Sequence, residues 1–252
     1  MQLAHERVGA GPALVLIHGI TERRESWRPL IEPLAQHYDV VAVDLRGHGD
    51  SPNGDVYDPL ALATDVHETV TGLDLVNPLV IGHSLGGVIA SAYAAVGRPR
   101  AIINVDQPLK LAEFKSALSQ VEPLLRGDTA SFESAIEMIF GSMWGVLQAD
   151  EVARIAAISA PRQEVVLAIW NTVFDSTADE LDAIVEALVG AITVPYLSLH
   201  GIDPGEGYTT WLRRLMPSAT VEVWPDQGHY PHLVQPARFL ERVTDFDHLA
   251  LS

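Results

Sequence analysis

The strongest constraint on the fold is a series of short apolar runs that alternate with helical patterns. Four runs rich in Val, Ile and Leu lie in the first 106 residues, and a Gly, an Asp or a His-Gly pair follows each run. They are residues 14–17, 40–43, 79–81 and 101–105. Continuous apolar runs are typical of parallel strands that are buried on both faces. Helical patterns over 59–73 and 85–96 separate them, so the alternation predicts an α/β fold with a doubly wound, mostly parallel sheet.

The middle of the chain has a different pattern. Helical patterns dominate from residue 107 to 190, and strands return only at 194–199 and 220–224, before a last helix over about 236–246. The helices are expected at 111–125, 131–140, 151–158, 161–174 and 179–189, with Pro161 as a first helical residue and Ser176 with Asp179 as a cap. We expect residues 1–106 and 191–252 to form one core. Residues 107–190 should form a helical cap over the carboxyl ends of the strands, where such folds bind ligands.

Composition excludes several classes of protein. Acidic residues outnumber basic ones by 33 to 16, which gives a net charge of −17 and argues against nucleic acid or an anionic membrane as a partner. The absence of cysteine excludes disulfides, thiol nucleophiles and zinc–cysteine sites. No apolar run has the length of a membrane span, and His5, Glu6 and Arg7 stand where a signal peptide would be apolar. We therefore expect a soluble, cytoplasmic protein.

The residues from Gly82 to Gly87, with the sequence Gly-His-Ser-Leu-Gly-Gly, lie between a predicted strand and a predicted helix. This is the context of a Gly-x-Ser-x-Gly nucleophile elbow, in which a serine occupies a strained turn and glycines avoid steric overlap. A serine hydroxyl needs an adjacent base to act as a nucleophile. The motif therefore predicts Ser84 as the nucleophile of an enzyme.

Three further groups complete the expected site. His229, in a loop after the last predicted strand, is the expected general base. Asp203, after strand 194–199, is the expected acid that orients it, which gives the chain order Ser, Asp, His. The backbone N–H groups of Leu85 and of Ile20, in the His-Gly-Ile loop after the first apolar run, are the expected oxyanion-hole donors.

Four segments together resemble the α/β-hydrolase fold superfamily, in its serine esterase and lactonase branch. They are Leu16–Ile20, Asp44–Gly49, Gly82–Gly87 and Gly228–Leu233. The resemblance implies a mostly parallel sheet of seven or eight strands, a helical cap after strand six and no cofactor. Because the amino terminus is short, we expect the usual first strand to be missing. Some relatives draw the acid from the strand end where Asp106 stands, so Asp106 is the alternative to Asp203.

These observations predict a serine hydrolase that cleaves a neutral or weakly polar carboxylic ester or lactone through an acyl-enzyme. A carbon–carbon bond hydrolase, a cofactor-free lyase or a perhydrolase could use the same triad, and a non-catalytic receptor could keep the scaffold. No metal site or nucleotide-binding motif is expected, because His232 beside His229 lacks further ligands and no complete glycine-rich phosphate loop occurs. The small-molecule substrate should contact large apolar side chains. The candidates are Trp27, Met138, Trp144 and Trp170.

Overall fold

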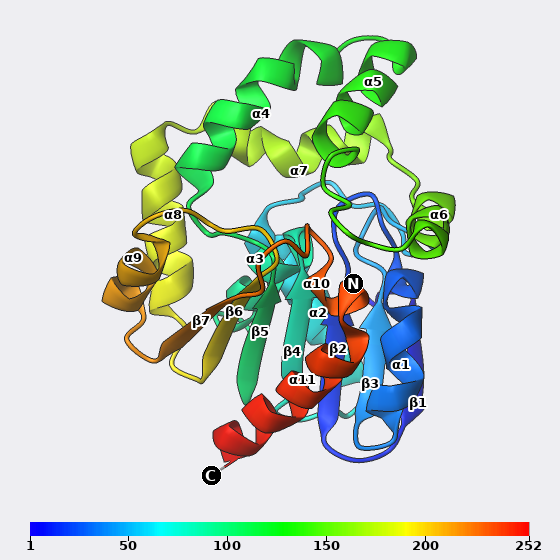
Figure 1. Cartoon of the computed structure of the whole chain (residues 1–252), viewed down its shortest axis with the longest axis vertical. Coiled ribbons are helices and arrows are strands. Elements are labelled where there is room, and N and C mark those ends of the chain that lie inside the picture. The colour runs from blue at the N-terminus through cyan, green and yellow to red at the C-terminus, as the bar shows by residue number, and fades with distance from the viewer. Residues whose placement is uncertain (252) are drawn as a thin grey trace.

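The computed structural model describes residues 1–251, apart from the side chains at positions 113 and 251. Its centre is a seven-stranded sheet in the order β1-β3-β2-β4-β5-β6-β7, in which β1 is antiparallel to β3 and the other strands are parallel (Figure 1). The strands are β1 His5–Gly9, β2 Ala13–Ile17, β3 Asp39–Val43, β4 Leu79–His83, β5 Ala101–Val105, β6 Tyr196–His200 and β7 Ala219–Val223. The predicted α/β class and mostly parallel sheet are confirmed.

Helices cover both faces of the sheet because its central strands are apolar on both sides. In β2 all five residues are buried, with Val15 and Ile17 in one apolar cluster and Leu14 and Leu16 in the other. The first cluster includes residues of α2, α3 and α9, and the second includes residues of α1 and α11. These helices are α1 Arg28–Ala35, α2 Pro59–Gly72, α3 Leu85–Tyr93, α9 Tyr208–Leu215 and α11 Pro236–Leu251; the short elements are η1 Arg24–Trp27 and α10 Pro231–Val234.

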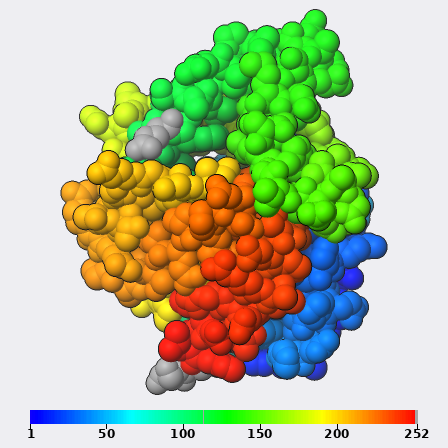
Figure 2. Space-filling model, viewed as in Figure 1, coloured from blue at the N-terminus to red at the C-terminus, as the bar shows by residue number. Residues whose placement is uncertain are grey.

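Five helices lie between β5 and β6 in the chain. They are α4 Leu111–Leu125, α5 Thr129–Phe140, α6 Ala149–Ile158, α7 Gln163–Asp175 and α8 Ala178–Gly190. Figure 1 shows α4, α5 and α7 beyond one end of the sheet, and in Figure 2 the green residues of α4–α6 form the upper part of the surface. We keep residues 107–190 as a proposed cap. In this chain the segment follows the fifth strand, β5, and not the sixth as expected.

Several local predictions differ from the structure. The edge strand β1 was not predicted, because His5–Gly9 is largely exposed and lacks an apolar run. Helix α7 begins at Gln163 and not at Pro161, since Arg162 is extended and the N–H of Ala160 donates to the carbonyl of Thr21 in the core. The cap of α8 is a capping box of Thr177 and Glu180, in place of Ser176 and Asp179.

No helix in the described part of the chain is both long and apolar enough to cross a membrane. The carboxyl ends of the parallel strands form one edge of the sheet, and this edge faces the segment between β5 and β6 (Figure 1). The chemically distinctive residues of the sequence lie at this edge.

Candidate active site

Ser84 lies in the sharp turn between β4 and α3. Its backbone has φ 53° and ψ −124°, a left-handed value of φ that costs energy for a residue with a side chain. The turn leaves no room for side chains around it, because a Cβ on Gly82 would lie 1.8 Å from the carbonyl oxygen of Gly86. A Cβ on Gly86 would lie 2.3 Å from the carbonyl oxygen of Ile17. The strained geometry expected for a nucleophile elbow is therefore present.

His229 lies in the loop after β7, and its imidazole faces a carboxylate. Its Nδ1 lies 2.7 Å from Oδ2 of Asp106, and both side chains are buried. A carboxylate can only accept a hydrogen bond when ionised, so Nδ1 carries the proton in this pair. Nε2 is then the nitrogen that could accept a proton. Ser84, His229 and Asp106 all line the same cavity, as does Leu85.

The partner of His229 is Asp106, and the expectation of Asp203 is wrong. Asp106 directly follows β5, and its Oδ1 accepts hydrogen bonds from the N–H groups of Gly201 at 2.7 Å and Ile202 at 3.0 Å. Asp203 is exposed, and its Oδ1 accepts from the N–H of Gly205 at 2.9 Å. The physical reason is that the Asp203 side chain closes its own turn, whereas that of Asp106 lies between the β6–α9 loop and the histidine loop.

The surroundings of Asp106 keep it ionised. Burial raises the pKa of this carboxyl, but the hydrogen bond and charge of His229 and the two backbone donors outweigh burial and lower the pKa. Asp106 therefore stays negative at neutral pH. A fixed negative charge beside His229 would stabilise an imidazolium formed when that ring takes up a proton.

The two expected oxyanion-hole residues lie beside Ser84. Leu85 is the first residue of α3, so its N–H has no acceptor within the helix and lies at the positive end of the helix dipole. Ile20 lies in the turn after β2 that the hydrogen bond from Glu22 N to Gly19 O closes. Among the described residues, no hydrogen bond is assigned to the N–H of Ile20 or of Leu85, and both residues line the cavity. The two N–H groups remain the proposed donors.

The cavity above Ser84 has a volume of about 240 Å³ and mostly apolar walls. Helices α4, α5 and α7 supply Phe114, Ile139, Ile169 and Trp170, and no lysine or arginine lines the cavity within the described part of the chain. Of the four aromatic or Met candidates, Trp170 is in the wall. The other three are elsewhere. Trp27 is completely buried in the second apolar cluster, and Met138 is 60% exposed. Trp144 stacks on Tyr230, with 5.3 Å between the ring centroids.

The sequence pattern could have indicated part of this wall. Phe114 lies one turn after Leu111 on α4, and Val173 lies four residues after Ile169 on α7, so each pair shares a helix face. The same spacing also occurs on helix faces that only pack against one another. Periodicity alone therefore does not distinguish a cavity wall from a core, which is why Met138 was a candidate and Phe114 was missed.

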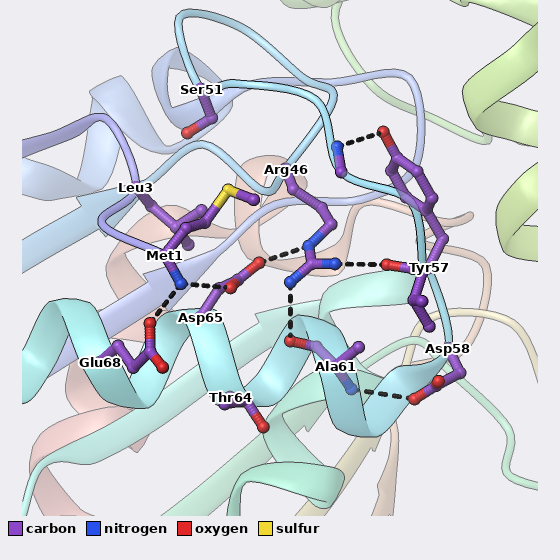
Figure 3. A network of polar contacts seen from close by, with 12 residues as sticks. Met1, Leu3, Arg46, Ser51, Tyr57, Asp58, Ala61, Thr64, Asp65 and Glu68 are labelled. Carbon is purple, nitrogen blue, oxygen red and sulfur yellow. Dashed lines mark hydrogen bonds and ion pairs between the residues drawn. The ribbon is translucent and has the colours of Figure 1, made fainter.

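The loop that carries Tyr57 into the cavity wall is held by Arg46. The Arg46 guanidinium forms an ion pair with buried Asp65 of α2 and donates to the carbonyl of Val56 (Figure 3). The N–H of Gly54 donates to the Tyr57 hydroxyl at 3.2 Å. Arg46 belongs to the Asp44–Gly49 motif, so one function of that motif here is to fix the side wall of the cavity.

The other histidines near the strand ends contact the backbone or other side chains. His18 accepts a hydrogen bond from the N–H of Leu45 at Nε2, and its Nδ1 lies 2.7 Å from the carbonyl of Gly19. Burial lowers the pKa of His18 to about 4. His232 packs against Trp27 and His83. Within the described residues, no group of three or more potential ligands could hold a metal ion.

Comparison with known proteins identifies the family. Residues 14–242 match the Alpha/beta hydrolase family, and the chain therefore belongs to it. The strained serine turn and the seven-stranded sheet described above are features that the sequence resemblance implied. The resemblance to the α/β-hydrolase superfamily is thus confirmed at the level of family and fold.

Individual relatives show how far the likeness extends. The 2-(acetamidomethylene)succinate hydrolase of Mesorhizobium japonicum is 28% identical over 94% of this chain and 88% of that protein. The sn-1-specific diacylglycerol lipase ABHD11 of Mus musculus is 26% identical over 93% and 80%, respectively. The structure of the esterase EaEST from Exiguobacterium antarcticum has a TM-score of 0.81 with 18% identity, over 99% of this chain and 96% of that one, which is a likeness of fold. The first curated relatives align over only 26% to 30% of their own length.

Proposed function

We propose that this protein is a serine hydrolase that cleaves a neutral or weakly polar carboxylic ester or lactone. The observation that carries the proposal is that Ser84, in a strained elbow, shares one apolar cavity with a buried His229–Asp106 pair. A diacylglycerol lipase among the similar proteins adds support. The corrected triad is Ser84, His229 and Asp106.

The chemistry follows from these groups. Ser84 Oγ attacks the carbonyl carbon while Nε2 of His229 takes up the hydroxyl proton, and the N–H groups of Ile20 and Leu85 bind the oxyanion. The tetrahedral intermediate collapses, the bond to the alcohol oxygen breaks, and His229 returns the proton to that oxygen. His229 then removes a proton from water, whose oxygen attacks the acyl carbon. The bond from that carbon to Ser84 Oγ breaks, Oγ takes the proton back from His229, and the acid is released. Asp106 keeps the imidazole oriented throughout.

The lining of the cavity supports a neutral substrate. A carboxylate on the substrate would lose hydration in an apolar cavity without gaining a cationic partner, and unpaired burial of a charge is costly. The proposed cap also has 13 acidic and only 5 basic residues, so an anionic substrate would approach against the field. Both effects favour uncharged acyl groups.

The test uses p-nitrophenyl butyrate, the p-nitrophenyl monoester of succinic acid, and a fluorophosphonate probe. We expect hydrolysis of the butyrate ester with a burst of nitrophenol, a kcat/KM at least tenfold lower for the succinate ester, and one phosphonate adduct on Ser84. The Ser84→Ala variant should lose several orders of magnitude in kcat and all labelling. Folded wild-type protein that neither turns over esters nor labels at Ser84 would contradict the proposal and favour a receptor.

A further inference from the structure

A buried carboxylate lies behind the elbow and is not used by the proposed chemistry. Glu22 follows the Gly19–Ile20 loop and is 5% exposed, yet within the described residues no lysine or arginine forms an ion pair with it. A buried charge without a cationic partner is costly, so a protein retains one where its interactions have a specific use. The groups that Glu22 does contact indicate that use.

Two polar side chains lie near the Glu22 carboxylate among the described residues, and both are next to proposed catalytic residues in the chain. Its Oε1 accepts a hydrogen bond from the Tyr230 hydroxyl at 2.9 Å, and Tyr230 is the neighbour of His229. The same oxygen lies 3.8 Å from Nδ1 of His83, and His83 is the neighbour of Ser84. The carboxylate of the oxyanion loop is therefore hydrogen-bonded to the histidine loop and lies near the elbow without a hydrogen bond to it.

A separate hydrogen bond joins His83 of the elbow to the main chain of His229. Nε2 of His83 lies 2.8 Å from the carbonyl oxygen of His229, and because a carbonyl only accepts, Nε2 is the donor. The rings of His83 and His229 lie 4.6 Å apart between centroids. A neutral His83 that donates from Nε2 has no proton on Nδ1, and among the described residues this Nδ1 has no hydrogen-bond partner.

The electrostatics agree with a charged Glu22. Burial alone would raise the pKa of this carboxyl, but the facing imidazole of His83 and the hydroxyl of Tyr230 outweigh burial and lower the pKa to about 2. Burial and the negative charge of Glu22 raise the pKa of Tyr230 well above its ordinary value, so the Tyr230 hydroxyl keeps the proton that it donates. Both groups thus hold their roles at neutral pH.

We propose that Glu22 is a positioning residue that joins the oxyanion loop to the histidine loop through Tyr230, while His83 separately joins the elbow to the same loop. Its carboxylate fixes the Tyr230 hydroxyl, and with it the backbone of the neighbouring His229. This inference rests on the proposed function of Ser84 and His229. It adds a residue that sets where the base lies, without touching the substrate.

The experiment compares Glu22→Gln with Glu32→Gln, an exposed glutamate of α1 that serves as the matched control. Circular dichroism establishes folding, and assays are run below the melting temperature of each variant. We expect Glu22→Gln to lower kcat for p-nitrophenyl butyrate at least tenfold with KM within twofold of wild type, and Glu32→Gln to leave both unchanged. Tyr230→Phe, which removes the hydroxyl that donates to Glu22, should lower kcat by at least the same factor.

A second measurement is independent of turnover. The Nδ1–H of His229, held by Asp106, should give a downfield proton resonance that exchanges slowly with water, and Asp106→Asn should shift it. We expect faster exchange of this proton in Glu22→Gln and in Tyr230→Phe. If both variants fold and keep the wild-type exchange rate and kcat, the positioning role of Glu22 is wrong. If wild type itself lacks esterase activity but exchange still responds to Glu22, the proposed function fails and the positioning role stands.

Discussion

At the scale of single residues, opposite effects on kcat are expected when Asp106 and Asp203 are each replaced by Asn. Asp106→Asn should lower kcat by about 10³- to 10⁴-fold, because an amide can stabilise the wrong tautomer of His229 and carries no charge to stabilise the imidazolium. Asp203→Asn should stay within about twofold of wild type, since its side chain bonds only to the turn at Gly205. Steady-state kinetics with p-nitrophenyl butyrate measures both. A severe loss in Asp203→Asn with near-normal Asp106→Asn would reverse the assignment.

At the scale of elements, the turn between α5 and α6 supports the histidine loop. The N–H of His229 donates to the carbonyl of Met143 at 2.8 Å, and the backbone of Gly145 packs against that of Gly228. A Cβ on Gly145 would lie 2.6 Å from Cα of Gly228, and the φ of Gly145 is +57°. We therefore expect Gly145→Ala to displace the turn from the histidine loop and to lower kcat about tenfold or more, measured with the same ester.

The chain offers a matched control for this change. Gly190 ends α8 in the same proposed cap, and a Cβ there would meet no atom within 4 Å. Gly190→Ala should keep kcat within twofold of wild type and should not lower the melting temperature, because alanine favours helix over glycine. Equal kcat values for the two alanine variants would mean that the turn does not support His229.

At the scale of the whole molecule, buried histidines predict sensitivity to acid. Burial lowers the pKa of each of four histidines, to about 4 for His18 and His200, to about 3 for His48, and well below the ordinary value for His232. Between about pH 6.5 and 4 the unfolded chain therefore binds protons that the folded chain does not, and the free energy of unfolding falls as pH falls. With four such histidines, the free energy of unfolding can change by at most about 5 kcal/mol per pH unit.

Urea unfolding at a series of pH values from 7 to 4 measures this slope. The high net negative charge of the chain acts in the opposite direction, because it adds repulsion at pH 7 that acid relieves. Adding 0.5 M salt screens that repulsion but has little effect on the buried histidines. We expect the acid-induced loss of stability to be steeper in salt, and a free energy of unfolding that is independent of pH from 6.5 to 4 would contradict this prediction.

The sequence alone determined the features that depend on local pattern. Residues 101–105 and 111–125 have the same bounds in the prediction and in β5 and α4, because continuous apolar runs and helical periodicity arise from neighbouring residues. The elbow at Ser84 was also visible, since steric crowding in a tight turn demands glycine at fixed positions. The edge strand β1 was missed because its pairing with β3 is a long-range contact that leaves no apolar run.

Only the tertiary structure decided which acid meets His229 and which aromatic side chains line the cavity. Asp106 and Asp203 both follow a strand of the same sheet, and β5 and β6 are neighbours, so their positions in the chain do not distinguish them. The choice depends on which carboxylate the histidine loop reaches after crossing from β7. Trp27 and Trp170 likewise differ only in what packs around them. Such contacts join residues far apart in the chain, and their free energy depends on the packing of the whole fold.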